Sequence, residues 1–464
     1  MYFAQHYLDC LSQASYLIGD EVTGRAVVVD PRRDVEEYLT DAAAHGLTIV
    51  GVINTHFHAD FLAGHLELAE STGAWIGYGA VAQTEYESRS LADGERIELG
   101  DVALEIVETP GHTPESISVL VYEHSSDAVP YGVLTGDALF IGDVGRPDLL
   151  ASIGSTAEEL GRQLYDSVQH KLMRLPDEVR IFPAHGAGSA CGKNLSTQLQ
   201  STIGQQRLSN YACQPMSVEA FLEVVTEGQP AAPEYFVYDA VLNRSNHAVL
   251  GGDRALPALT PTDAVDTRTH GAVLVDTRES HDFAAGHLAG SINIPADGRF
   301  AETAGMVLQP DQKVVVVATP GGEQEVATRL ARIGFDHAVG YLPALDSAFI
   351  ELESDMVRSS RLTPRQLSDL LATDDPPWVV DVRNAGELDA GTIPGSAHIP
   401  LAELARRIDE VPADRPIVVY CASGWRSSVA ASFLRNRGLA DASDLAGGFA
   451  AWETLVSPPR PEPS

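Results

Sequence analysis

The sequence is poor in cysteine and has no long apolar segment. Its four cysteines, Cys10, Cys191, Cys213 and Cys421, are scattered along the chain and show no paired spacing. This argues against a disulfide framework and a cysteine-rich zinc site, and it favours a reducing cytoplasm, where thiols stay available. No stretch approaches the apolar length that spans a bilayer, and residues 1–20 lack the basic and apolar regions of a secretory signal.

Basic residues are also scarce, with 31 lysines and arginines against 65 aspartates and glutamates, which gives a net charge of −34. Binding to nucleic acid or to anionic lipid needs a basic face, so neither partner is expected. The acidic residues are spread along the chain and predict a well-solvated surface rather than an acidic tail. The chain length of 464 residues predicts about three domains.

Short apolar runs in the first segment, residues 1–213, predict a sheet-rich domain. We expect helices over Asp34–His45 and Ala157–Arg174, and a short helix near Val218–Val225 in a connector at residues 214–257. The expected buried strands are Ala26–Val29, Ile49–Ile53, Val102–Val107, Ile117–Val121, Gly132–Leu134 and Val179–Phe182.

The rest of the chain contains two repeats, at residues 258–355 and 360–457, and ends in a proline-rich tail at 458–464 that is expected to be disordered. Each repeat opens with a threonine–proline pair, beginning at Thr260 and Thr363, as expected for the start of a helix.

The two repeats share a longer motif. Asp276–Pro295 aligns with Asp381–Pro400, and the spacing from the first aspartate to the last proline is identical. Strands alternate with helices in both repeats, so each is predicted to be an α/β domain with a parallel sheet.

A histidine-rich motif directly follows one of the predicted strands. It reads His-Phe-His-Ala-Asp-Phe at residues 56–61, and later turns marked by glycine or proline carry His112, Asp137 and His185. Imidazole and carboxylate side chains gathered from four strand ends form a site for a divalent metal. A lone histidine on a strand is more often a packed core residue, but four such motifs in order predict a metal centre.

These motifs resemble those of the metallo-β-lactamase fold, and within it the branch of glyoxalase II and the persulfide dioxygenases. Residues 140–149 read Phe-Ile-Gly-Asp-Val-Gly-Arg-Pro-Asp-Leu, and residues 183–194 read Pro-Ala-His-Gly-Ala-Gly-Ser-Ala-Cys-Gly-Lys-Asn. Both runs are similar to the dioxygenase side of that branch. The resemblance implies an α/β fold in which an αββα sandwich precedes the two repeats.

The resemblance also implies a metal. Two-metal members of the family carry histidine where this chain has Phe61, and phenylalanine cannot bind a metal. One Fe(II) per chain is therefore implied, held by His56, His112 and Asp137 and leaving open positions for substrate and O2. Three further side chains would lie around these ligands and orient them or hydrogen-bond the substrate, and retained family packing is an equally open interpretation of them: His58, Asp60 and His185.

The implied reaction oxidises the outer sulfur of a low-molecular-weight persulfide, typically glutathione persulfide, with O2 to give sulfite and a thiol. Arg146 and Lys193 are candidates to bind substrate carboxylates, and Asp148 is a third substrate-binding candidate, although either cation could equally be a surface charge. Cys191 is expected to be a small buried residue, and contact with the substrate sulfur is the alternative.

In the last repeat, Cys421 follows a predicted strand and precedes a predicted helix. A cysteine at a helix N-terminus faces free backbone N–H groups, which favour a thiolate and then a persulfide. The loop resembles the active loop of rhodanese sulfurtransferases, which implies that Cys421 and Arg426 are catalytic. The predicted cradle of the persulfide consists of Ala422, Ser423, Gly424, Trp425 and Ser427.

The middle repeat departs from this pattern. Its loop at residues 318–324 has neither the cysteine nor the arginine, so the repeat resembles the inactive half of tandem rhodaneses. Asp381, Arg383 and Glu387 match a bracing motif of the rhodanese fold and are interpreted as structural.

Several questions stay open at this level. They are which thiol carries the persulfide, whether thiosulfate is made or used, and whether the chain forms a homo-oligomer. Two other functions also remain. One is a glyoxalase II-like thioesterase with two zinc ions, against which Phe61 counts. The other is a non-catalytic sulfur carrier or scaffold, against which the complete ligand set counts.

Overall fold

The computed structural model describes residues 1–149, 155–251, 255–343 and 345–456. The chain forms two compact units. The first contains the described residues up to 251 together with 332–334, and the second contains the remaining described residues. The tail predicted to be disordered, at 458–464, lies outside the described residues. Of the helices in these described ranges, none is both long and apolar enough to cross a bilayer.

The first unit contains two six-stranded sheets. The first sheet keeps the chain order from β1 to β6, with β1 to β3 antiparallel and β3 to β6 parallel. The second sheet has the order β12-β11-β10-β9-β8-β7 and is antiparallel apart from the pair β10 and β11. The strands are β1 (Tyr2–Leu8), β2 (Gln13–Asp20), β3 (Arg25–Val29), β4 (Thr48–Ile53), β5 (Trp75–Gly79), β6 (Arg89–Leu91), β7 (Arg96–Glu98), β8 (Ala103–Glu108), β9 (Ile117–Tyr122), β10 (Gly132–Gly136), β11 (Arg180–Pro183) and β12 (Ser201–Thr202).

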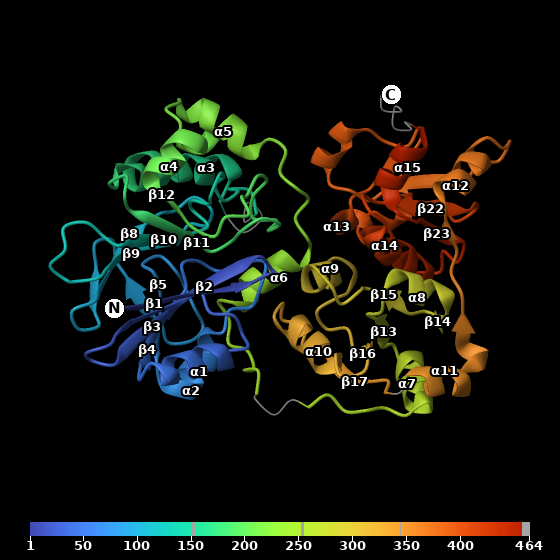
Figure 1. Cartoon of the computed structure of the whole chain (residues 1–464), viewed down its shortest axis with the longest axis horizontal. Helices are drawn as coiled ribbons and strands as arrows, with labels where there is room; N and C mark the ends of the chain where they lie inside the picture. Colours follow the sequence, from blue (N-terminus) through green and yellow to red (C-terminus); the bar gives the residue numbers. More distant parts are fainter. Residues whose placement is uncertain (150–154, 252–254, 344, 457–464) are drawn as a thin grey trace, which may run out of the picture. The chain divides into compact units, whose positions relative to one another are not determined.

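Helices and sheets form four layers in this unit (Figure 1), and apolar cores join these layers. The central core lies between the sheets and includes Val27 and Ile53 from the first sheet and Ile106 and Val119 from the second. A second core joins the first sheet to α1 and α2, and a third joins the second sheet to α3, α4 and α5. The unit is therefore an αββα sandwich. Its helices in these layers are α1 (Glu36–Ala44), α2 (His65–Thr72), α3 (Ala157–Asp166), α4 (Ile203–Ser209) and α5 (Val218–Thr226).

The segment expected to be a connector packs into this first unit. Phe221 and Val225 of α5 lie in the same core as Leu164 of α3, and α6 (Tyr235–Leu242) follows within the unit. The helix predicted near residues 218–225 is present as α5. The sequence did not predict α6, because apolar residues occupy nearly all of its positions and show no helical period.

The second unit contains two parallel sheets, with the orders β15-β13-β16-β17 and β19-β23-β22-β20-β21. The repeats pair in the same register, because Asp276 lies opposite Asn293 in one and Asp381 lies opposite His398 in the other. The predicted α/β class with parallel sheets is confirmed. The strands of these sheets are β13 (Val273–Asp276), β15 (Ile292–Asn293), β16 (Val314–Val317), β17 (Ala338–Tyr341), β19 (Arg361–Leu362), β20 (Trp378–Asp381), β21 (Ala397–His398), β22 (Ile417–Tyr420) and β23 (Ala442–Leu445).

Helices flank both sheets of the second unit (Figure 1). The predicted threonine–proline helix starts are present, since the side chains of Thr260 and Thr363 accept hydrogen bonds from the backbone of the first turn. The helices are α7 (Pro261–Thr269), α8 (Ser280–Ala285), α9 (Phe300–Val307), α10 (Glu323–Ala331), α11 (Leu345–Glu351), α12 (Pro364–Leu371), α13 (Leu401–Leu404), α14 (Trp425–Asn436) and α15 (Gly448–Val456).

Candidate metal centre and cysteine loop

The histidine and aspartate motifs of the first unit all follow strand ends. The motif at residues 56–61 comes after β4, His112 after β8, Asp137 after β10 and His185 after β11. Because these strands belong to two packed sheets that share one core, their ends bring the side chains together. The sandwich therefore builds a polar, buried site from four separate segments.

His56, His112 and Asp137 form a compact group of donor atoms. One atom from each side chain lies within 4.8 Å of the other two. Asp137 Oδ2 is 3.8 Å from His56 Nε2 and 3.5 Å from His112 Nε2. This carboxylate oxygen is buried and has no hydrogen-bond partner among the described residues. A buried oxygen without a partner is costly, so the arrangement fits a bound cation.

Hydrogen bonds fix which ring nitrogens of the two histidines face the site. The Thr55 hydroxyl donates its only proton to Asp30, so it must accept a hydrogen bond from His56 Nδ1, 2.9 Å away. His112 Nδ1 donates to the carbonyl oxygen of Arg146 at 2.9 Å. In its neutral form each ring therefore presents an unprotonated Nε2 to the site, and this is the nitrogen that can bind a metal.

His58 has a different environment. Its Nε2 lies 3.0 Å from Asp30 Oδ1, and its buried Nδ1 has no hydrogen-bond partner within the described residues. Asp30 also accepts hydrogen bonds from the backbone and the hydroxyl of Thr55, so this one carboxylate orients the segment that carries the motif. No sequence pattern marks Asp30, which directly follows β3.

A second group of donors lies beside the first. It consists of Asp60, His185 and Cys191, again with one atom from each within 4.8 Å of the others. His185 Nδ1 donates to Asp137 Oδ1 at 2.8 Å, and its Nε2 lies 2.8 Å from Asp60 Oδ2. His185 thus links the two groups, and Cys191, which the sequence left open, lies next to them.

Electrostatics keeps these groups in distinct protonation states. Burial, with the nearby His58, holds the pKa of His56 well below its ordinary value. Burial alone would raise the pKa of Asp137, but His185 and the other histidines hold it well below its usual range. Burial and the carboxylates of Asp60 and Asp137 raise the pKa of the Cys191 thiol. His56 is thus a neutral imidazole and Asp137 an ionised carboxylate, and both are forms that bind a divalent metal.

Phe61 occupies space beside this second group. The side chain is fully buried, and its ring centroid lies 4.2 Å from that of His58 and 6.3 Å from that of His185. An aromatic ring at this place contributes no metal ligand.

The cysteine loop in the second unit lies between β22 and α14. Cys421 is buried, and its sulfur accepts hydrogen bonds from the backbone N–H groups of Gly424 and Ser427 at 3.1 and 3.4 Å. Gly424 has a φ of 99°, which glycine adopts readily, and it turns the loop so that these N–H groups face the sulfur. The start of α14 therefore surrounds the sulfur with donors.

Arg426 is paired rather than free. Its guanidinium donates two hydrogen bonds of 2.7 Å to Glu387. Burial favours the protonated form of Glu387, but Arg426 holds the pKa of this acid below its ordinary value. Arg383 forms a similar bidentate pair with Asp381. The Arg426–Glu387 pair joins the loop to the turn after β20, and the Arg383–Asp381 pair lies at the end of that strand.

Comparison with known proteins gives two family matches. Residues 8–185 match the metallo-beta-lactamase superfamily, and residues 260–343 and 363–455 each match the rhodanese-like domain. Persulfide dioxygenase ETHE1, a mitochondrial protein of Bos taurus, is 32% identical over 215 residues, which are 46% of this chain and 75% of the relative. The chain belongs to the metallo-β-lactamase superfamily. It has persulfide dioxygenase homologues and carries two rhodanese-like domains.

Two further proteins that are similar to this chain carry names other than persulfide dioxygenase. A hydroxyacylglutathione hydrolase of Rhodospirillum rubrum is 31% identical over 172 residues, covering 37% of this chain and 60% of the relative. The crystal structure of a metallo-beta-lactamase from Staphylococcus aureus superposes with a TM-score of 0.66 and 34% identity, over 73% of this chain and 98% of that one. The family alone therefore does not choose between oxidation and hydrolysis.

The predicted substrate residues of the metallo-β-lactamase domain already have protein partners. The Arg146 guanidinium is buried, forms a bidentate pair with Asp148 at 2.7 Å and also donates to the carbonyl of Pro230. Lys193 Nζ donates to the carbonyls of Val224 and Glu227. Their role in substrate binding stays a prediction.

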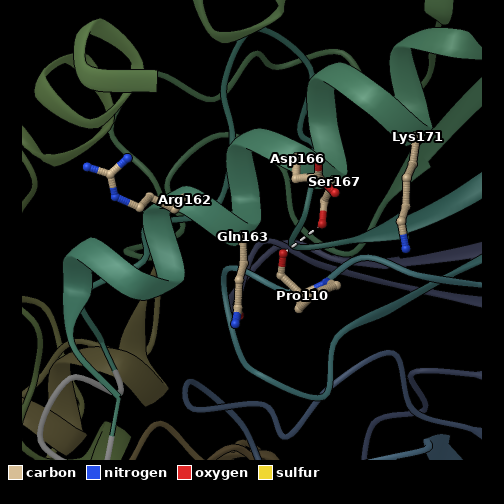
Figure 2. A pocket seen from close by; sticks show the side chains of 6 residues that line it. All are labelled: Pro110, Arg162, Gln163, Asp166, Ser167 and Lys171. Carbon is tan, nitrogen blue, oxygen red and sulfur yellow. Dashed lines mark hydrogen bonds between the residues drawn. The ribbon is translucent and has the colours of Figure 1, made fainter. Parts of the chain in front are cut away.

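A separate pocket of about 260 Å³ lies beside α3 in the same domain. Figure 2 shows that Ser167 points towards Pro110, whose carbonyl oxygen accepts its hydrogen bond at 2.7 Å. The two cations at this pocket are engaged, Lys171 by the carbonyl of Glu108 and Arg162 by Glu158. No metal-site residue lines the pocket, which is formed by Pro110, Arg162, Gln163, Asp166, Ser167 and Lys171.

In the rhodanese-like domains, sequence reasoning missed the contribution of α15. The N–H groups of Phe449 and Ala450 donate to the carbonyls of Cys421 and Ala422. Gly448, which begins this helix, has a φ of 59°, and a Cβ atom there would lie 2.4 Å from the Cys421 carbonyl oxygen. The close approach of α15 to the loop therefore requires glycine at this position.

Replacing Gly448 with alanine should destabilise the loop. The new methyl group meets backbone atoms and the residue keeps an unfavourable φ, so we expect a loss of about 2 kcal/mol or more in unfolding free energy. Denaturant unfolding should register this loss. Gly395→Ala is a suitable control, since its φ is also positive but no atom lies within 4 Å of the added Cβ. Equal stability of the two variants would contradict the assignment.

Proposed function

We propose that the metallo-β-lactamase domain oxidises the outer sulfur of a low-molecular-weight persulfide with O2 at one Fe(II), and that Cys421 carries sulfane sulfur in the last domain. The observation that carries the first part is the buried Asp137 Oδ2, which faces two imidazole Nε2 atoms and has no other partner among the described residues. Two histidines and one carboxylate are the donor set of non-haem iron oxygenases.

His56, His112 and Asp137 would hold the iron, since their donor atoms are close together and buried. When bound, Fe(II) supplies open coordination positions and the redox chemistry that O2 requires. The proposed surrounding side chains, His58, Asp60 and His185, do not belong to this donor group.

The protein's own contribution is to orient and dry the centre. Thr55 and the carbonyl of Arg146 hold the two ligand rings through Nδ1, and His185 holds the second oxygen of Asp137. Each donor atom is thereby fixed before the metal arrives, which reduces the cost of binding it. Phe61 excludes water and a second ion from the adjacent space.

The overall reaction balances without a further reductant. A persulfide anion, O2 and water give a thiol, sulfite and one proton, so the outer sulfur is oxidised and the inner sulfur leaves as the thiol. Glutathione persulfide is the proposed substrate, and Arg146, Asp148 and Lys193 remain its proposed binding residues. In the last step the oxygen of water bonds to the oxidised outer sulfur, the sulfur–sulfur bond breaks, and the inner sulfur leaves as a thiolate that takes up a proton.

The second reaction takes place on Cys421. The outer sulfur of a Cys421 persulfide bonds to sulfite, the sulfur–sulfur bond breaks, and thiosulfate and the Cys421 thiolate result. The N–H groups of Gly424 and Ser427 would stabilise the thiolate, and Arg426 is the proposed cation of the loop. The reverse direction, from thiosulfate to persulfide, uses the same groups.

The experiment that tests the first proposal is metal analysis of anaerobically purified chain, combined with O2 uptake on addition of glutathione persulfide. We expect the purified protein to contain iron, and we expect O2 consumption and sulfite formation to rise in proportion to the iron content. Protein stripped of metal by a chelator should consume no O2 and regain uptake with Fe(II) but not with Zn(II). O2 uptake that is independent of iron would reject the proposal.

A thioesterase with two zinc ions is the second candidate. The group of Asp60, His185 and Cys191 offers additional ligands, and a relative is named a hydroxyacylglutathione hydrolase. Thioester hydrolysis by zinc-loaded protein, without O2 uptake by the iron form, would favour it. Neither activity in either form would favour a non-catalytic sulfur carrier.

Phe61→His is expected to create a second metal site. The new imidazole would join Asp60, His185 and Cys191, and four such donors suit zinc. After identical zinc loading, the variant should hold a second zinc ion per chain and show weaker dioxygenase activity, because the second ion would occupy space that the substrate needs. Metal-to-protein ratios measure this. Equal ratios in the two proteins would mean that the environment of His58 and Asp60 sets the metal number instead.

The cellular setting is also proposed. All four cysteines are free, and the mechanism needs Cys421 as a thiol, which a reducing cytoplasm preserves.

The proposed domain boundaries are 1–213, 214–257, 258–355 and 360–457.

A further inference from the structure

Asn243 lies far along the chain from the metal motif but binds it directly. It caps the C-terminus of α6, is fully buried, and belongs to the segment beyond the metallo-β-lactamase match. Its Nδ2 donates to the carbonyls of His58 and Phe61, both at 2.8 Å, and its Oδ1 accepts from the N–H of Ala63 at 2.9 Å. All three side-chain hydrogen bonds thus go to the backbone of residues 58–63.

A chain of hydroxyl groups holds Asn243 in place from the other side. The Tyr86 hydroxyl lies 2.6 Å from the Asn243 carbonyl oxygen and can give it its only proton. The Tyr86 hydroxyl also lies 3.1 Å from the Tyr78 hydroxyl, which accepts a hydrogen bond from Asn54 Nδ2 at 2.8 Å. Asn54 precedes His56 by two residues, so the chain returns to the start of the motif.

The same segment makes one more contact to the motif. The Tyr235 hydroxyl, at the start of α6, donates to the carbonyl of Asp60 at 3.2 Å. Residues 58–63 form no regular strand or helix, and their buried backbone groups need partners. Helix α6 and its cap supply several of them.

We infer that Asn243 is a positioning residue for the metal centre, which sets the path of residues 58–63 and so the placement of the metal donors on either side. This rests on the proposed metal site but not on the oxidation chemistry. The loop between β4 and α2 presents His56 at one end, while its middle carries Asp60 and Phe61 towards the second donor group. A shift of the backbone there would move all of them together.

The side-chain amide is suited to this role because it both donates and accepts. Aspartate has nearly the same shape and could still accept from Ala63, but it would place a carboxylate oxygen against the carbonyls of His58 and Phe61. Asn243→Asp therefore turns two of the three hydrogen bonds into repulsive contacts between oxygens, while the volume of the side chain hardly changes.

The test is a competition titration of the metal-free chain with Fe(II) under anaerobic conditions, against a chelator of known affinity. We expect Asn243→Asp to raise the dissociation constant about tenfold, the lower end of what loss of an outer hydrogen-bond partner costs a metal site. The absorption bands of Co(II) bound in place of iron should also shift, because they report ligand geometry rather than stability. An unchanged dissociation constant with unchanged bands would overturn the inference.

Asn293→Asp is the matched control. Asn293 is equally buried, and it donates to the carbonyls of Asp276 and Arg278 and accepts from Ser428, all within the second unit. The same chemical change there should leave metal affinity within about twofold. An equal loss of affinity in both variants would mean that general destabilisation, not loop position, is being measured.

Tyr86→Phe is the second variant if Asn243→Asp does not fold. It removes only the hydroxyl that supports Asn243, and a rise of about threefold in the dissociation constant is expected. No change would count against the inference. Failure of the proposed function looks different, since the unsubstituted protein would then bind the metal without consuming O2.

Discussion

Replacing His112 with alanine should remove both the metal and the O2 uptake. The substitution deletes one of three closely placed donor atoms and leaves Asp137 Oδ2 beside a single imidazole. We expect the iron content of the purified variant to fall to background and O2 consumption to fall at least about a hundredfold, since even outer partners of a metal site cost 10–100-fold. Iron analysis and an oxygen electrode measure the two quantities on one preparation.

His65→Ala is the matched control for the loss of a buried imidazole. His65 is fully buried in α2 but belongs to neither donor group among the described residues. Its variant should keep iron if it folds, which circular dichroism establishes. Oxygen consumption in His112→Ala with iron still bound would reject the ligand assignment.

The second large effect is expected for Cys421→Ser. Serine keeps the shape of the loop, and its hydroxyl can accept from the N–H groups of Gly424 and Ser427. A hydroxyl is hardly ionised at neutral pH, however, so it cannot attack sulfane sulfur as a thiolate does. Thiosulfate formation and cleavage should fall by about a thousandfold or more, while sulfite formation by the first domain stays intact.

Cys213→Ser controls for the loss of a buried thiol, because Cys213 lies in the core of the first unit. It should retain both activities. Survival of sulfur transfer in Cys421→Ser would place the nucleophile elsewhere, and Cys191 would be the next residue to replace.

Local patterns predicted much of this molecule. The two repeats could be recognised because the same short motif occurs in both with the same spacing. The equal spacing also explains why Asp276 and Asp381 have partners at equivalent positions of their own sheets. The metal motifs were visible because each is contained in a few residues after a strand. The hairpin of β1 and β2 was not predicted, since its residues mix polar and apolar types even where they are buried.

Long-range polar contacts could not be predicted. Asn243 reaches the motif across some 180 residues, and no sequence pattern marks its partners. The pairing of Arg146 with Asp148 and of Lys193 with two carbonyls was equally hidden, because a sequence does not distinguish a free cation from a satisfied one. Buried polar residues gain their roles only from the fold around them.

The N–H groups at the start of α14 have a consequence for the approach of substrates. They attract an anion only within a few ångströms, whereas the net charge of −34 repels it over a Debye length of about 10 Å at 0.1 M salt. Thiosulfate carries two negative charges at neutral pH, and sulfite is a mixture of its singly and doubly charged forms, so the long-range encounter of both anions with the chain is slowed. Added salt screens the repulsion more than the contact, and encounter should therefore become faster as ionic strength rises.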